Sequence, residues 1–80
     1  MEFFVYILYS VSRDKYYIGH TEDVSRRIQE HRIRKNLGAD DWELLYKESF
    51  PTRSEAMKRE REIKQKKKRS YILQLITSQQ

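Results

Sequence analysis

The 80-residue sequence contains no cysteine, a single proline and two glycines. Without cysteine the chain has no disulfide, no thiolate nucleophile and no cysteine-ligated zinc or iron–sulfur site, so we expect a protein of the reducing cytoplasm. The longest apolar run, residues 3–9, is far shorter than the roughly 20 residues of a membrane helix, and no small-residue cleavage site follows it. We therefore expect no membrane partner and interpret this run as a core strand.

Negative charge is also in short supply, because 12 aspartates and glutamates face 17 lysines and arginines. Two segments carry the excess: residues 26–35 have a net charge of +4 and residues 58–69 one of +6. Such segments are either solvated helix faces or surfaces for a polyanion, and four consecutive cations at residues 66–69 favour nucleic acid. The predicted nucleic-acid contacts are Arg26, Arg34, Lys35, Lys58, Lys64, Lys66, Lys67, Lys68 and Arg69.

The short chain and its ten aromatic residues predict one folded domain over residues 1–80. Residues 3–9 are apolar on both alternating faces, which is typical of a central strand, and residues 15–20 form a second strand after a short polar turn. Residues 42–50 are a third strand. Alternation puts four of its side chains on one face: Trp42, Leu44, Tyr46 and Phe50.

Three helices complete the pattern. The first is expected from Glu22 to about Lys35, with Thr21 as its N-cap. Thr52 and Glu55 have the T-x-x-E spacing of a capping box, which begins the second helix. Ser70 is expected to cap a third, short helix. The predicted fold is α+β with the order β-β-α-β-α-α.

Several residues depart from an ordinary core pattern. Arg27 and His31 lie on the same third of the circumference of the first helix as its apolar residues. They are therefore either at the edge of the buried stripe or part of a site. If the numbers of two residues paired across the hairpin sum to an odd value, Tyr6 and Tyr17 lie on one face beside Gly19. Tyrosines there either pack against a helix or bind a phosphate or water. Glu55 is either a capping residue or a ligand of a hard cation.

Taken together, these residues resemble the GIY-YIG nuclease superfamily, in its small single-domain bacterial branch. The motif is a VYIL strand, then YIG-x-T-x-D-x-x-x-R-x-x-x-H over residues 17–31, then an S-E-A helix. The resemblance spans nearly the whole chain. Phe4 stands where the first motif has glycine, and we find no counterpart of a late polar residue present in some relatives.

The resemblance implies a three-stranded antiparallel sheet flanked by helices, and a metal-dependent endonuclease that hydrolyses DNA phosphodiesters. Tyr6 and Tyr17 would line the scissile phosphate, one of them orienting or deprotonating the water, with nearby cations lowering its pKa. Arg27 would neutralise phosphoryl charge, and His31 would contact phosphate or tune a tyrosine. Glu55 would hold Mg²⁺ or Mn²⁺.

The same fold also allows other functions. A non-catalytic module would bind nucleic acid without cleaving it, and a third alternative is a protein that binds RNA. The nuclease is expected in DNA repair or processing and to be structure-selective. The basic segments would supply salt-sensitive, sequence-neutral contact, and a protein partner would supply specificity. Neutralising residues 58–69 is expected to weaken binding without abolishing hydrolysis.

Overall fold

The computed structural model describes residues 1–33 and 40–78. The elements follow the order β1 (Phe3–Ser10), β2 (Lys15–Thr21), α1 (Val24–Ile33), β3 (Trp42–Phe50), α2 (Arg53–Lys66) and α3 (Arg69–Ser78). The strands form one antiparallel sheet in the order β2-β1-β3. This confirms the predicted α+β fold and its β-β-α-β-α-α order.

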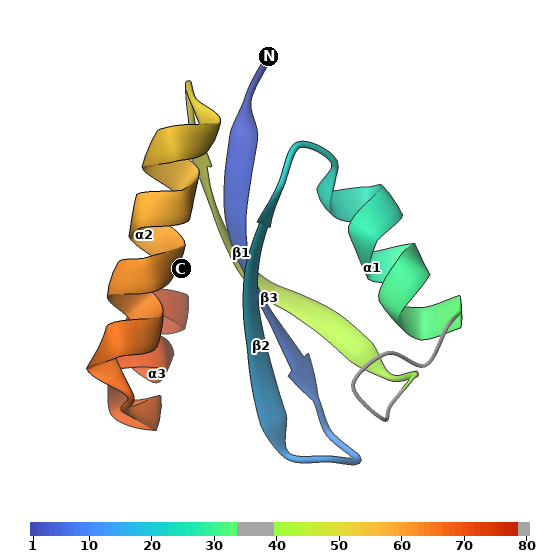
Figure 1. Cartoon of the computed structure of the whole chain (residues 1–80). Helices are drawn as coiled ribbons and strands as arrows, with labels where there is room; N and C mark the ends of the chain where they lie inside the picture. The colour runs from blue at the N-terminus through green and yellow to red at the C-terminus, as the bar shows by residue number, and fades with distance from the viewer. Residues whose placement is uncertain (34–39, 79–80) are drawn as a thin grey trace.

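The sheet separates two apolar clusters, because α1 covers one face and α2 and α3 cover the other (Figure 1). On the α1 side, Tyr6, Leu8 and Trp42 are buried, with Ile28 of α1 packed against them. On the other side, residues of α2 and α3 surround Val5. The central strand β1 supplies both clusters, as its apolar residues predict.

Strand β3 departs from the predicted alternation. A β-bulge shifts its register between Ile7 and Leu8 of β1, whose partners are Tyr46 and Leu44. The extra residue, Leu45, reverses the alternation, so Trp42 and Leu44 face α1 while Tyr46 and Phe50 face α2 and α3. The prediction that these four side chains share one face was wrong for this reason.

Helix α1 begins later than predicted. Its N-cap is Asp23, whose Oδ1 accepts the Arg26 N–H at 3.1 Å. Thr21 instead accepts the Asp23 N–H at 3.1 Å, so it supports the capping residue. Glu22 therefore precedes the helix, and the predicted end near Lys35 lies outside the described residues.

Helices α2 and α3 are separated by a short junction that contains one residue in a left-handed backbone conformation. Thr52 caps α2 as predicted, because its hydroxyl accepts the Glu55 N–H at 3.2 Å. Lys67 follows α2 with φ 53°, and α3 begins at Arg69. Ser70 thus lies inside the first turn of α3, which corrects its predicted capping role.

Within the described ranges, no helix is long and apolar enough to cross a membrane.

Candidate active site at the β2 edge

Two tyrosines and a glycine form the centre of the candidate site. Tyr6 of β1 pairs with Gly19 of β2, so the numbers of paired residues sum to 25. Tyr17 lies on the same face. The predicted odd register is therefore confirmed. The tyrosine ring centroids are 6.1 Å apart. A Cβ at Gly19 would lie 2.7 Å from the Tyr6 hydroxyl oxygen, so only glycine lets this hydroxyl lie over the edge strand β2.

Helix α1 adds Arg27 and His31 to the same face. The Arg27 guanidinium interacts with the Tyr6 hydroxyl, and this interaction raises the pKa of Arg27. His31 is 5% exposed, and its ring centroid is 4.9 Å from that of Tyr17. The structure thus brings together four of the predicted site residues: Tyr6, Tyr17, Arg27 and His31.

Three buried nitrogens in this cluster lack a hydrogen-bond partner among the described residues: Arg27 Nε and both ring nitrogens of His31. Buried polar atoms are usually paired, because desolvation without a partner is costly. Burial and the nearby Arg27 charge lower the pKa of His31, so its ring is neutral at neutral pH. A neutral imidazole keeps one nitrogen free to accept a proton.

The Tyr6 hydroxyl is more difficult to ionise than the sequence led us to expect. Burial raises its pKa to about 12, although the interaction with Arg27 acts in the opposite direction. Tyr6 is only 1% exposed, so desolvation of a phenolate outweighs the neighbouring cation. The expectation that nearby cations lower this pKa is not met in the protein alone, and Tyr6 is a neutral donor at pH 7.

The predicted metal ligand Glu55 lies elsewhere. It is exposed in the first turn of α2, a helix on the opposite face of the sheet from α1. Glu60, on the same helix, is half-buried and contacts His20 of β2, and its charge contributes to the raised pKa of Tyr6. These contacts favour Glu60 over the exposed Glu55 as the carboxylate of the site.

Glu60 approaches the same edge strand from the other face of the sheet. Its Oε1 is 2.6 Å from Nδ1 of His20, the residue after Gly19, and its Oε2 accepts a hydrogen bond from Lys64 Nζ at 2.8 Å. Burial opposes its ionisation, but these two hydrogen bonds outweigh that effect and lower the pKa of Glu60. Glu60 is therefore a carboxylate at neutral pH.

The sequence carries a signal for Glu60 that is separate from the motif residues. Ala56 and Ile63 are the buried residues of α2, and Glu60 lies between them at helical spacing. A carboxylate on a buried stripe is rare unless it is paired or functional. The partner His20 cannot be recognised from that spacing, because it lies forty residues away on β2.

The donor set fits Mg²⁺ or Mn²⁺ held mainly by substrate oxygens. Within the described residues there is no group of three or more His, Asp or Glu side chains that could enclose a metal. Magnesium is commonly bound through one or two carboxylates plus phosphate and water oxygens. The ionised Glu60 carboxylate, held against β2 by His20, meets that requirement.

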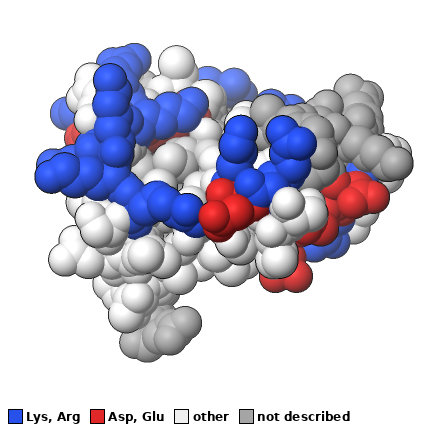
Figure 2. Space-filling model, turned by 90° about the horizontal axis from the view of Figure 1, so that it is seen from below, with Lys and Arg blue, Asp and Glu red and all other residues white. Residues whose placement is uncertain are grey.

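The predicted nucleic-acid contacts fall into three groups. Arg26 is on the exposed side of α1, where it pairs with Glu30 at 3.7 Å. Arg34 and Lys35 lie outside the described residues. The others are exposed on α2 and at the α2–α3 junction: Lys58, Lys64, Lys66, Lys67, Lys68 and Arg69. Figure 2 shows basic side chains gathered on the α2 side of the molecule.

Comparison with protein families identifies the family of this chain. The family model described as the GIY-YIG catalytic domain matches residues 2–72. This range contains Tyr6, Tyr17, Arg27, His31 and Glu60.

Individual proteins agree with this result. A UPF0213 protein of Halobacterium salinarum is 42% identical over 65 residues, covering 76% of this chain and 83% of its own length. A UPF0213 protein of Staphylococcus aureus is 40% identical over 70 residues, covering 76% and 78%. The solution NMR structure of a UPF0213 protein from Bacillus halodurans has a TM-score of 0.59 and 33% identity, covering 94% of this chain and 85% of that one.

Proposed function

The chain belongs to the GIY-YIG family, and we propose that it is an endonuclease that hydrolyses phosphodiester bonds in DNA with a single divalent ion. We further propose a structure-selective role in DNA repair or processing. One observation carries the proposal: Tyr6, Tyr17 and Arg27 meet at the edge strand β2, which Glu60 contacts through His20.

Arg27 is suited to stabilise the phosphoryl oxygens. Its Nε is buried without a partner among the described residues. A guanidinium remains charged throughout the reaction and can donate two parallel hydrogen bonds to a phosphate. Negative charge that develops on the phosphoryl group is then stabilised by a donor already in place.

The two tyrosines take different roles in this proposal. Tyr6, whose pKa is raised to about 12, keeps its proton and acts as a hydrogen-bond donor. Tyr17 orients the attacking water. Neutral His31, next to Tyr17, positions that ring and accepts a proton from the hydroxyl or the water.

Glu60 would hold the Mg²⁺ or Mn²⁺, with His20 keeping its carboxylate ionised and oriented. When bound, the ion supplies Lewis-acid stabilisation of the leaving 3′ oxygen. Glu55 is left as a residue of the α2 first turn.

The test is cleavage of branched, nicked and single-stranded DNA with Mg²⁺ or Mn²⁺. Arg27→Ala is expected to lower the rate on bound DNA by about 10²–10³-fold, as removal of a charge-stabilising donor does elsewhere. Arg26→Ala removes the same charge from the exposed side of α1, so it weakens binding but keeps the turnover of bound DNA.

Other outcomes would overturn this proposal. Binding without metal-dependent cleavage of any substrate would indicate the non-catalytic module, and RNA outcompeting DNA would indicate an RNA-binding protein. Cleavage that persists in Arg27→Ala would remove Arg27 from the chemistry.

A further inference from the structure

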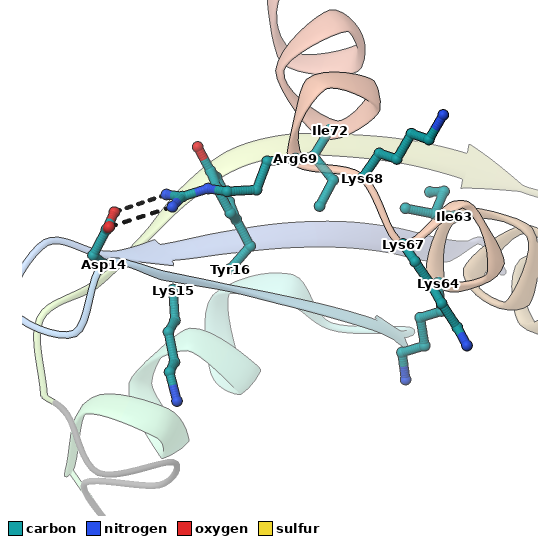
Figure 3. Close-up of a pocket in the computed structure, with 9 residues that line it drawn as sticks. All are labelled: Asp14, Lys15, Tyr16, Ile63, Lys64, Lys67, Lys68, Arg69 and Ile72. Carbon is teal, nitrogen blue, oxygen red and sulfur yellow. Dashed lines mark hydrogen bonds and ion pairs between the residues drawn. The ribbon is translucent and has the colours of Figure 1, made fainter.

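A second concave site lies away from the tyrosine cluster. It is a cavity of about 290 Å³ between the β1–β2 turn and the junction of α2 and α3 (Figure 3). None of Tyr6, Tyr17, Arg27 or Glu60 lines it. One carboxylate, Asp14, lines it together with five cationic residues: Lys15, Lys64, Lys67, Lys68 and Arg69. This charge balance selects an anion.

Arg69 is held in this cavity by groups that orient its guanidinium. Its Nη2 and Nη1 donate to the two carboxylate oxygens of Asp14 at 2.7 and 3.3 Å, and the group lies 5.1 Å from the Tyr16 ring centroid. Tyr9 donates to Asp14 at 2.6 Å. Two parallel hydrogen bonds from a guanidinium suit a phosphate as well as a carboxylate. Asp14 therefore presents two oxygens to Arg69, as a phosphate also can.

Backbone strain coincides with the same cavity. In the described part of the chain, the non-glycine residues with positive φ are Asp14 (51°) and Lys67 (53°), and both line it. A lysine rarely adopts this backbone conformation, and strain of this kind is concentrated at ligand sites. Two residues with a left-handed backbone, one from the turn and one from the helix junction, thus shape one cavity.

The cavity is connected to the candidate active site through Lys64. This residue lines the cavity and also donates to Glu60 at 2.8 Å.

The cavity also has apolar walls, formed by Ile63, Ile72 and the Tyr16 ring. A strand phosphate flanked by sugar and base matches cations beside apolar walls better than an acidic peptide does.

We propose that this cavity binds a phosphate group of the nucleic-acid strand on which Glu60 and the tyrosines act, and that Asp14 competes with that phosphate for Arg69. The proposal rests on the proposed function, because it takes the anion from a nucleic acid. In the free protein, Lys15 and Lys68 extend away from Arg69 (Figure 3). Phosphate binding would draw these flexible side chains toward the cavity.

The experiment measures binding of a labelled single-stranded oligonucleotide by fluorescence anisotropy, in EDTA so that no cleavage occurs. Arg69→Gln is expected to weaken binding about tenfold, as expected for the loss of a charge-assisted hydrogen bond. The matched control is Arg53→Gln, because Arg53 also lies over an aromatic ring, Phe3 at 5.2 Å, but outside the cavity. An equal effect of both substitutions would overturn the proposal.

A second variant tests competition by Asp14. Asp14→Asn keeps a side chain that tolerates positive φ but removes the charge that occupies Arg69. It is expected to tighten oligonucleotide binding about threefold, since exposed ion pairs have small energies. Weaker binding in Asp14→Asn, with an unchanged fold by circular dichroism, would contradict the proposal.

Competitors identify the anion. Inorganic phosphate is expected to displace the oligonucleotide and to shift the NMR signals of Arg69 and Tyr16, whereas a poly-glutamate peptide is not. A 5′-phosphorylated strand that binds more tightly than its 5′-hydroxyl form indicates a terminal phosphate, and equal binding indicates an internal one. Stronger displacement by poly-glutamate would instead indicate an acidic protein partner.

This test is independent of the nuclease assay. If the protein cleaves DNA but Arg69→Gln and Arg53→Gln bind alike, only the cavity proposal fails. If Arg69→Gln selectively weakens binding but no DNA is cleaved, only the endonuclease proposal fails.

Discussion

At the residue scale, the hydroxyl of Tyr6 occupies space that a Cβ on the paired residue of β2 would fill. Gly19 therefore serves the site by lacking a side chain. The same arrangement buries the phenol, which is why its pKa rises despite the interaction with Arg27. A residue type that weakens a strand is needed here because it leaves room for the Tyr6 hydroxyl.

The raised pKa of Tyr6 predicts a pH dependence of stability. The folded protein holds this proton up to pH about 12, whereas an unfolded tyrosine loses it near pH 10, so the stabilisation is present below about pH 10 and is lost as the pH rises to about 12. Over that range the wild type should lose about 3 kcal/mol more than Tyr6→Phe. Urea unfolding at a series of pH values measures the difference. Parallel curves for the two proteins would contradict the raised pKa.

The sequence predicted the residues around Tyr6 but not their electrostatics. The odd register of the hairpin puts Tyr6, Tyr17 and Gly19 on one face, and the helical spacing of Arg27 and His31 brings both onto the neighbouring side of α1. Burial depends on how closely α1 packs on the sheet. That packing decides whether Arg27 or desolvation has the larger effect on the pKa of Tyr6. The spacing of residues in the sequence does not reveal how close the packing is.

At the scale of elements, helix α2 connects the fold to the candidate site. Its buried residues, Ala56 and Ile63, pack with Val5 of the central strand, and Glu60 lies between them along the helix. Packing of this stripe therefore fixes the height and rotation at which Glu60 meets His20. A loosened α2 would displace the carboxylate as well as destabilise the core.

Shortening Ile63, which packs α2 against the sheet, should lower the stability of the fold. Ile63 is 1% exposed, so Ile63→Ala is expected to lower the free energy of unfolding by about 3 kcal/mol. Leu73→Ala is the matched control, because Leu73 is 49% exposed on α3, and it should cost less than about 1 kcal/mol. Urea denaturation gives both values. Equal losses would show that α2 does not pack on the sheet through Ile63.

The start of α2 was predictable because the cap is local, whereas the bulge in β3 was not. Thr52 and Glu55 are three residues apart, so their hydrogen bond needs no tertiary partner. The extra residue Leu45 is defined only by pairing with β1, some forty positions earlier in the chain. Local signals therefore predict the elements, whereas long-range pairing determines the faces that they present.

At the scale of the whole molecule, the charge excess separates into parts with different surroundings. Arg27 lies in the tyrosine cluster, whereas Lys64 and Arg69 belong to the second cavity. Arg59 is paired with Glu48 and donates to Tyr71, so it links α2, β3 and α3 instead of facing a ligand. Net charge predicts a polyanion partner, but only tertiary structure shows which cations are placed to meet it.

The proposed active site is assembled across the edge of the sheet, from tyrosines on one face and Glu60 on the other. The most direct measurement compares Glu60→Gln with Glu55→Gln, which remove the same charge from one helix, in single-turnover cleavage of bound DNA with Mg²⁺ or Mn²⁺. Glu60→Gln should lower the rate by about a hundredfold or more, and Glu55→Gln by less than about threefold. Equal losses, or a larger loss in Glu55→Gln, would contradict assembly of the site around Glu60.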